Sequence, residues 1–508
     1  MHRRAGSIRN AVKHEESDMD TTASLLAEFI DGIGFDDIPD GIVKQAKLVL
    51  LDSIGCALAG RHTDKGKIAL SCGNSGGSPP ESTMFGAGQK VSATLAAFVN
   101  GELLNALDYD ALCGPTGHVT PYVLSAPLAV AEWKNVGGKD LILAIVLAHE
   151  IAQRVCAGLV IPGRLSTKRS KEGLPLQLPI HGYGVHVFGG VAGVAKILGL
   201  NTEKIRHAFG IGGAMCPIPT LMQFVETVPS SMSKFTPSGW VSQAEVMAAL
   251  LAEKGYTGAQ NVFDGEFAFW KGFAADGWNP KVVVNGLGRS WFISDAIHFK
   301  RYPCCGAMHG ALDIFRAIID RFDIQPGHIR KIRVRLNLLA ELALWKNRHI
   351  ENHIDAQFSA AYVFAVAAHR IEIGHLWQAE DTYHAPEIVA FMKRINVDTP
   401  ASLPQENNRP LVEIIVRDHD TKQDKRYTER DVWPVQNRMD EQELFEKFKN
   451  NAASVLTPEK IDLALNTILS LEGLNDVACL MEFVSTRDQS RRSRTLSGDA
   501  EIGGSRGR

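Results

Sequence analysis

Long segments that are apolar on nearly every face, and rich in alanine and glycine, occupy much of the chain from about residue 22 to residue 290. Clear examples are residues 137–158, "GGKDLILAIVLAHEIAQRVCAG", residues 189–200, "GGVAGVAKILGL", and residues 238–255, "SGWVSQAEVMAALLAEKG". A helix that is apolar all round must be buried by its neighbours. These segments therefore predict a body of closely packed helices rather than a sheet protein with a few surface helices.

The pattern changes near residue 294. Residues 331–337, "KIRVRLN", and 411–421, "LVEIIVRDHDT", alternate apolar and polar side chains as strands do, and residues 421–433 are placed to return as the partner of a hairpin. Helical patterns lie between these strands, and two more follow over residues 440–473. This part of the chain predicts a smaller α+β unit.

The predicted fold class is mainly α, with a large all-helical domain that carries an inserted smaller α+β lid domain. The predicted boundaries are a disordered N-terminus at 1–20, a helical domain made of 21–293 and 432–485, a lid domain at 294–431, and a disordered tail at 486–508. The two ends are assigned to disorder because they lack apolar periodicity. A ligand is expected between the two domains.

Composition excludes several classes of function. The formal net charge is −3 over 508 residues, and no long basic run favours nucleic acid. Apolar runs are interrupted too often for a membrane span. The eight cysteines form no C-x-x-C pair, which favours a reducing compartment and argues against an iron–sulfur cluster. We expect a cytoplasmic protein. The Arg-containing start leaves a mitochondrial presequence as the alternative.

The segment "NALDYDALCGPTGHVTPYVL", residues 105–124, breaks a run of packed helices with glycine and proline and brings two carboxylates near an imidazole. Asp108 is expected at the C-terminal end of a helix, where the dipole disfavours negative charge. A raised pKa would make Asp108 a proton donor. The alternative interpretation of the segment is a polar turn that satisfies only its own backbone.

His118 is expected just before a helix that has Thr120 as its N-cap and Pro121 at its first position. A helix N-terminus disfavours an added proton, which keeps the imidazole neutral, as a general base must be. The same N-terminus suits an anionic substrate.

Other candidates lie further along the chain. His181 and His186 flank glycines, and we expect one of them in a site and the other in the core. A zinc site is disfavoured because no third ligand or H-E-x-x-H helix accompanies them. Lys234, in "SSMSKFTPSG", is either a carboxylate clamp or a solvated lysine.

The segment "IHFKRYPCCGAMHG", residues 297–310, joins the two predicted domains and contains basic side chains before a helix. It is either an anion site or a basic pair on the surface. Its candidates are Lys300, Arg301, Cys304, Cys305 and His309. Glycine-rich segments elsewhere lack the strand–turn–helix context of a dinucleotide site.

Several of these pieces together resemble the MmgE/PrpD family, and the resemblance extends over about 22–485. The pieces that carry it are "LLDSIGCALAG", "NGELLNALDYDAL" with its following "GH", "AKILGL", the spacing from Lys234 to Gly239, "FKRYPCCGAMHG" and "AQFSAAY". The resemblance implies a helical domain with an α+β lid, a homodimer, and catalysis on small polycarboxylates without metal, cluster or other cofactor.

The resemblance also implies roles for individual residues. The positions that match the family's site are Asp108, His118, Lys234, Lys300, Tyr362 and, with His186 as a competitor, His181. Departures are Ala111 where many members have a second Asp, Cys305 where several have a lid histidine, with His309 following, and Phe-Thr-Pro after Lys234.

The shared chemistry is removal of a proton near a carboxylate, with the developing charge stabilised by fixed cations. Lys234 and Lys300 would supply the cations, and His118 and Asp108 would transfer the proton. The favoured reaction is dehydration of a 2-methylcitrate-like or alkylcitrate-like substrate, as in propionate metabolism. The alternatives are decarboxylation of cis-aconitate to itaconate, epimerisation or isomerisation of a small dicarboxylate, and a catalytically silent homologue.

Overall fold

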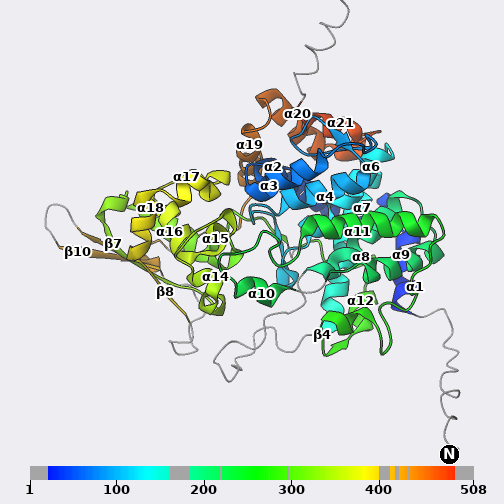
Figure 1. Ribbon diagram of the computed structural model, residues 1–508, viewed down its shortest axis with the longest axis horizontal. Coiled ribbons are helices and arrows are strands. Elements are labelled where there is room, and N and C mark those ends of the chain that lie inside the picture. Colours follow the sequence, from blue (N-terminus) through cyan, green and yellow to red (C-terminus); the bar gives the residue numbers. More distant parts are fainter. Residues whose placement is uncertain are drawn as a thin grey trace, which may run out of the picture.

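The computed structural model describes residues 21–160, 183–217, 220–273, 275–294, 297–399, 412–417, 423–432, 434–435 and 438–486. His181, the predicted N-terminal disordered segment at 1–20 and all but the first residue of the predicted tail lie outside the described residues. The described chain is mainly helical, with a small mixed sheet in its C-terminal part (Figure 1). The predicted fold class is confirmed.

The first part of the chain is a layered assembly of helices. Its α-helices are α1 (Thr22–Gly32), α2 (Asp40–Gly60), α3 (Asp64–Gly73), α4 (Ala93–Leu104), α5 (Thr120–Val123), α6 (Ser125–Trp133), α7 (Gly138–Gly158), α8 (Val187–Ile197), α9 (Thr202–Ala214), α10 (Leu221–Val225), α11 (Ser238–Glu253) and α12 (Pro280–Val284). Two-residue strands pair between them: β1 (Ser82–Thr83) with β2 (Lys90–Val91), β3 (Leu112–Cys113) with β6 (Ile297–His298), and β4 (Leu159–Val160) with β5 (Gly277–Trp278).

Helix α7 is the core of this body. It is long and apolar enough to cross a membrane, but 94% of its apolar window is buried inside the protein, so it serves as a packed core helix. Its closest neighbour is α8. A Cβ added to Gly189 would lie 2.2 Å from the carbonyl oxygen of Ala148 on α7. The two helices are therefore as close as they are because that position of α8 has no side chain.

The C-terminal part contains a four-stranded sheet with the strand order β10-β9-β7-β8. Its strands are β7 (Ile329–Arg335), β8 (Ile395–Asp398), β9 (Val412–Arg417) and β10 (Asp424–Thr428). The antiparallel β9–β10 hairpin confirms the strand prediction, with Asp424 opposite Arg417. The parallel strand β8 was not predicted, because its four residues are too few to show an alternating pattern.

Helices cover the sheet and then return to the body. Those near the sheet are α13 (His309–Arg321), α14 (Ala343–Lys346), α15 (His353–Phe358), α16 (Ala360–Ala368), α17 (Glu380–Tyr383) and α18 (Pro386–Phe391). The last three are α19 (Glu441–Ala453), α20 (Pro458–Leu469) and α21 (Ala478–Phe483). Helices α19 and α20 pack against α2 (Figure 1). This return supports the proposed insertion of a lid domain, whose boundaries stay a prediction.

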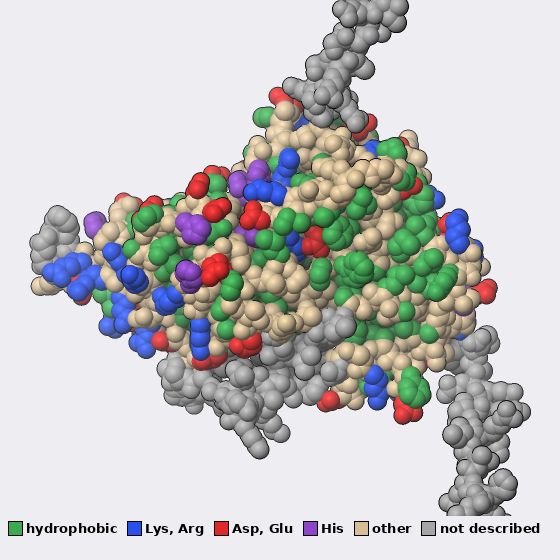
Figure 2. Space-filling view, viewed as in Figure 1, with side chains coloured by type: hydrophobic (Ala, Val, Ile, Leu, Met, Phe, Trp, Pro, Cys, Tyr) green, Lys and Arg blue, Asp and Glu red, His purple; other side chains and the backbone are tan. Residues whose placement is uncertain are grey.

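The two ends of the molecule have different surfaces (Figure 2). Lys and Arg side chains gather at the β7/β10 end, where Arg330 forms an ion pair with Asp424 at 3.0 Å. Apolar side chains appear over α11, where Trp240 is 53% exposed. Acidic side chains such as Asp424 neutralise part of this basic surface. We therefore keep the expectation that nucleic acid is not a partner.

Candidate active site

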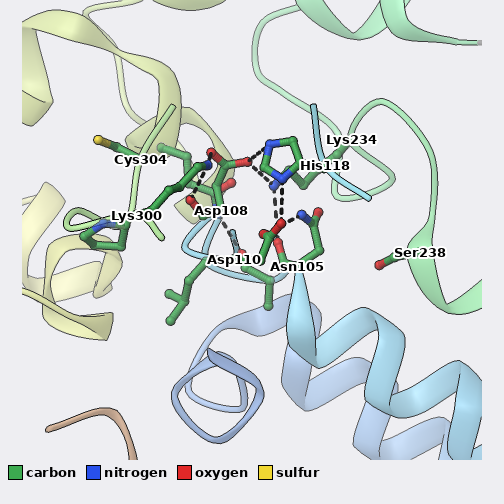
Figure 3. A network of polar contacts seen from close by, with 12 residues as sticks. Asn105, Asp108, Asp110, His118, Lys234, Ser238, Lys300 and Cys304 are labelled. Carbon is green, nitrogen blue, oxygen red and sulfur yellow. Dashed lines mark hydrogen bonds and ion pairs between the residues drawn. The ribbon is translucent and has the colours of Figure 1, made fainter. Parts of the chain in front are cut away.

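The site is built where a loop of the helical body meets the segment that leads into the C-terminal part. In the loop between α4 and α5, β3 pairs antiparallel with β6, placing Leu112 opposite His298 and Cys113 opposite Ile297. The pairing brings the loop that contains Asp108 and Asp110 beside the segment that contains Lys300. Residues nearly two hundred positions apart thus form one polar cluster (Figure 3).

Asp108 lies at the centre of this cluster and is buried (Figure 3). Its Oδ1 lies 2.8 Å from Nζ of Lys234, and its Oδ2 lies 2.7 Å from Nζ of Lys300. Lys300 also donates to the carbonyl oxygen of Asp108 at 2.7 Å, and Lys234 to that of Asn105 at 3.2 Å. The interpretation of Lys234 as a solvated lysine is wrong, since both lysines are buried.

Backbone geometry sets the direction of these side chains. Asp108 has a φ of 53° and Lys234 a φ of 51°, in the left-handed region that non-glycine residues seldom adopt. Such a conformation costs about 1–3 kcal/mol and persists only where the surroundings enforce it. Here two ammonium groups and one carboxylate provide that constraint from separate segments of the chain.

The expectation that the pKa of Asp108 is raised is wrong. Burial raises it, but Lys234, Lys300 and His118 together outweigh burial and hold the pKa well below its usual range. The helix-end argument fails because α4 ends at Leu104, with Asn105 as its C-cap, and Asp108 lies beyond it. Asp108 is therefore an ionised hydrogen-bond acceptor and not a proton donor.

His118 is fixed by a second carboxylate. Its Nδ1 lies 2.6 Å from Oδ2 of Asp110, and its Nε2 lies 3.5 Å from Oδ1 of Asp108. Burial raises the pKa of Asp110, but His118 and Lys300 together outweigh burial and lower it. An ionised carboxylate can only accept, so the proton between the two residues belongs to Nδ1. Nε2 is then the atom of His118 that faces Asp108.

Aromatic rings set the plane of this imidazole. Phe235 stacks on His118 with ring centroids 5.2 Å apart, and Tyr183 approaches edge-on at 5.6 Å. Gly117 has a φ of 77°, and a Cβ at this position would lie 2.5 Å from the Tyr183 hydroxyl oxygen. Glycine is therefore required for Tyr183 to pack against the residue before His118.

The predicted capping of the helix after His118 is wrong. Helix α5 starts at Thr120, its N-cap is Val119, and no side chain caps it. The Thr120 hydroxyl instead lies 3.1 Å from Nε2 of His149, because Thr120 is buried inside the first turn. With only four residues in α5, its dipole gives no basis for an anion site.

Two predicted lid residues lie near the cluster. Burial and the charge of Asp108 raise the pKa of the Cys305 thiol to about 11, so Cys305 is a neutral thiol. Burial and the ammonium of Lys300 lower the pKa of His309 to about 3. Nε2 of His309 lies 3.3 Å from the carbonyl oxygen of Cys304. His309 is therefore a neutral, half-buried imidazole next to the backbone of Cys304.

The remaining predicted residues are placed less directly. The hydroxyl of Tyr362 donates to the carbonyl of Trp377 at 2.6 Å, so its proton is committed within the C-terminal part, and its role in the site stays a prediction. The ring of His186 stacks on the ring of Tyr183 with the centroids 5.7 Å apart, and Tyr183 in turn packs edge-on against His118. His181 lies outside the described residues, so the choice between the two histidines stays open.

Some members of the cluster were missed from the sequence. Asp110 was recognised as a neighbouring carboxylate but not placed in the site, although the D-x-D spacing was a signal for it. Asn105 donates to Oδ1 of Asp110 at 2.9 Å, and only its place after an apolar helix could have indicated a role. Across the described residues, no group of three or more His, Cys, Asp or Glu side chains is arranged to hold a metal ion.

Comparison with known proteins gives two family matches. Residues 24–281 match the MmgE/PrpD N-terminal domain, and residues 302–471 match the MmgE/PrpD C-terminal domain. One curated relative is the cis-aconitate decarboxylase of Aspergillus terreus, which is 24% identical over 491 residues that cover 91% of this chain and 95% of the relative.

Two further relatives align over similar lengths. The cis-aconitate decarboxylase of Homo sapiens is 24% identical, with 90% of this chain and 92% of the relative covered. The cis-aconitate decarboxylase-like protein oryM of Aspergillus oryzae is 25% identical, with 91% and 96% covered. Since the two domain matches together span most of its length, the chain belongs to the MmgE/PrpD family.

Proposed function

We propose that the protein is a lyase that decarboxylates a small polycarboxylate, with cis-aconitate as the substrate. The observation that carries this proposal is an ionised Asp108 held between Lys234 and Lys300, with Nε2 of His118 3.5 Å from the same carboxylate. The names of the aligned relatives support the choice of substrate.

The two lysines are suited to bind carboxylates. Burial lowers the pKa of Lys234 to about 8, while for Lys300 Asp108 and Asp110 outweigh burial and raise the pKa. Both groups are therefore mainly cationic at neutral pH. A tricarboxylate that leaves water needs fixed cations to replace its hydration, and these two ammonium groups can be shared between Asp108 and the substrate.

The proposed step keeps atoms and charge balanced. The bond between the CH₂ carbon of cis-aconitate and its carboxylate breaks, and its electron pair forms a new C=C bond. The electrons of the original double bond move to the adjacent CH carbon, which takes a proton from Nε2 of His118. The products are CO₂ and the itaconate dianion. His118 then regains one proton from solvent.

Each residue has one part in this step. Lys234 and Lys300 stabilise the charge that develops on the carboxylate conjugated to the CH carbon. Asp110 holds Nδ1–H, so that His118 remains oriented whether or not Nε2 carries a proton. Asp108 lies 3.5 Å from Nε2, close enough to stabilise the imidazolium before it gives up the proton.

Dehydration of a 2-methylcitrate-like or alkylcitrate-like substrate was favoured from the sequence, and it now ranks second. Expulsion of hydroxide needs an acid, and Asp108 was expected to supply it. Because its pKa is held well below the usual range, Asp108 cannot fill that role at neutral pH. The acids that keep dehydration as an alternative are the ammonium of Lys234, with a pKa of about 8, and Nε2–H of His118.

The test is turnover by the full chain of cis-aconitate, citrate, 2-methylcitrate and a longer alkylcitrate, with products identified by mass. We expect loss of CO₂ from cis-aconitate. Loss of water from 2-methylcitrate without CO₂ release from cis-aconitate would reverse the ranking. Inversion of a small chiral dicarboxylate, followed by optical rotation in a separate assay, would favour an epimerase. Binding without turnover of any compound would favour a silent homologue.

The homodimer implied by the resemblance also remains a proposal. Trp240 and Met247, two turns apart on α11, are 53% and 37% exposed, and a shared apolar patch of this kind can mark a protein–protein interface. Light scattering of the wild type in solution tests it directly, since a mass near 55.4 kDa would contradict a dimer.

A further inference from the structure

A second buried ion pair lies next to the proposed site, and no step of the reaction uses it. Nζ of Lys447, on α19, lies 2.7 Å from Oδ1 of Asp52, on α2, and both side chains are almost completely buried. The pair joins the C-terminal helices to the first long helix of the body.

The Lys447 ammonium also binds the segment that contains the proposed active-site carboxylates. It donates to the carbonyl oxygen of Tyr109 at 2.8 Å, and it lies 3.8 Å from the centroid of the Tyr109 ring. Tyr109 is the residue between Asp108 and Asp110. One ammonium therefore fixes the peptide that connects the carboxylate bound by the lysines to the carboxylate bound by His118.

Tyr109 also contacts a small apolar cluster and the segment that contains Lys300. Its ring packs with Cys56, Ala59 and Leu107 in a small apolar cluster that is separate from the main core. Its hydroxyl donates to the carbonyl oxygen of Arg301 at 3.2 Å, next to Lys300. The residue is thus held at its carbonyl, its ring and its hydroxyl.

We propose that Asp52 and Lys447 are positioning residues, which fix the Tyr109 peptide so that Asp108 faces the two lysines and Asp110 faces Nδ1 of His118. The proposal rests on the proposed function, because it assigns the pair a part in that reaction. Neither residue needs to touch the substrate for this role.

The energetics favour a positioning role over a purely stabilising one. Removing two charges from water costs more than a modest ion pair returns, and apolar replacements of buried pairs are often as stable or more so. What an apolar pair cannot do is donate to the Tyr109 carbonyl while that residue lies beside Asp108 with its positive φ of 53°. Conformational specificity is the property that this pair adds.

The main test is Lys447→Met, which keeps a long unbranched side chain without the ammonium group and so removes its three polar interactions. For cis-aconitate turnover by the full chain, we expect kcat to fall ~10–100-fold, since a displacement on the order of 1 Å has that effect, while KM changes less than about threefold. Asp52→Asn, which leaves Lys447 without its counter-charge, should change the same parameter in the same direction.

The matched control is Arg154→Met. Arg154 and Glu150 form a fully buried ion pair on α7, with 2.5 Å between Nε and Oε1, and Arg154 binds backbone carbonyls in the segment 283–290. Removing it should lower the melting temperature and leave kcat within about twofold of the wild type. An equal fall in kcat for Arg154→Met would show that loss of a buried pair matters only through stability.

A readout without substrate separates this proposal from the proposed function. The Nδ1 proton of His118, in its 2.6 Å hydrogen bond to Asp110, should give a downfield NMR signal in histidine-labelled protein, assigned by its absence in His118→Ala. We expect the signal to move or disappear in Lys447→Met and to stay in Arg154→Met. If wild type does not convert cis-aconitate, the proposed function fails while this signal still tests positioning. An unchanged signal in folded Lys447→Met, or in Asp52→Asn if Lys447→Met does not fold, overturns the positioning role.

Discussion

Asp108 and Asp52 are both buried carboxylates, and the contacts of Lys447 with Asp52 and Tyr109 connect them. Their pKa values shift in opposite directions. Burial raises the pKa of both. Asp108 meets the ammonium groups of Lys234 and Lys300, and its pKa falls well below the usual range. Asp52 has one ammonium, that of Lys447, and a backbone hydrogen bond from Ala111, while burial and the negative charge of Asp110 keep its pKa raised. A single buried ammonium does not offset the loss of hydration here, whereas two of them with His118 do.

The two carboxylates also differ in whether the groups around them include one that can transfer a proton. The Asp108 cluster contains the imidazole of His118, a type of side chain that serves in general acid–base catalysis. The Lys447 ammonium contacts a carboxylate, a backbone carbonyl and an aromatic ring of the protein itself. The first arrangement has the elements of a proton-transfer site, and the second has those of a support for it.

The largest expected effect comes from removing the imidazole that distinguishes the two arrangements. His118→Ala should lower kcat by ~10²–10⁴-fold, the usual contribution of a positioned acid or base. The measurement is steady-state kinetics, with a thermal melt to establish that the variant is folded. A kcat near that of the wild type would show that the loop is only a polar turn, and a collapse of the melting temperature would show that the ring is structural.

A smaller effect should follow from leaving Asp108 with one lysine partner, as Asp52 has. Lys300→Met leaves Asp108 with a single lysine, so the pKa of Asp108 should rise and one cation for the substrate is lost. A hydrogen bond to a charged group contributes about 1.5–3 kcal/mol, which corresponds to a ~10–100-fold rise in KM if the lysine binds substrate before the chemical step.

The control for that variant is Lys139→Met, because Lys139 is an exposed lysine with a weak 3.8 Å contact to Asp36. It should leave KM and kcat unchanged. If Lys300→Met changes kcat alone and leaves KM as in the wild type, Lys300 acts only in the transition state and is not a ground-state clamp.

Much of the fold could be predicted because its signals are local. Helices that are apolar all round indicate burial wherever they occur, and the β9–β10 hairpin is carried by a simple alternation. The choice of Asp108, His118, Lys234 and Lys300 as a site came from a loop between packed helices and from family resemblance. The structure brings these four side chains together.

The ionisation of Asp108 could not be predicted, because it depends on partners 126 and 192 positions away. A helix-end argument sees only the local backbone and gave the wrong sign. The same holds for Thr120, whose hydroxyl contacts His149 on α7 instead of capping a helix. Lys447 lies in an amphipathic helix whose sequence gives no sign of a role in the site. Only the packing of α19 on α2 brings its ammonium to the carbonyl oxygen of Tyr109.

The smallest predicted effect concerns how the two carboxyls change stability with pH, and it sharpens the comparison most directly. The pKa of Asp108 in the folded state is below its ordinary 3.8, so its stabilising effect is present above about pH 3.8 and lost as pH falls through the folded pKa. The pKa of Asp52 is above 3.8, so the folded state binds more protons there and stability declines as pH rises through that window. The difference in melting temperature between Asp108→Asn and wild type should therefore fall as pH rises toward 3.8. The difference between Asp52→Asn and wild type should increase as pH rises above 3.8.

Each change in melting temperature should be on the order of 1–3 °C, since one pKa unit is about 1.4 kcal/mol and the chain is long. Melts at closely spaced pH values measure the slopes, and the slopes matter more than the offsets, because each variant also leaves an ammonium without its partner. Asp36→Asn, at a side chain that is 94% exposed, should give no slope. Slopes of the same sign for Asp108→Asn and Asp52→Asn would mean that a second lysine does not reverse the effect of burial, and the contrast between the two carboxylates would fail.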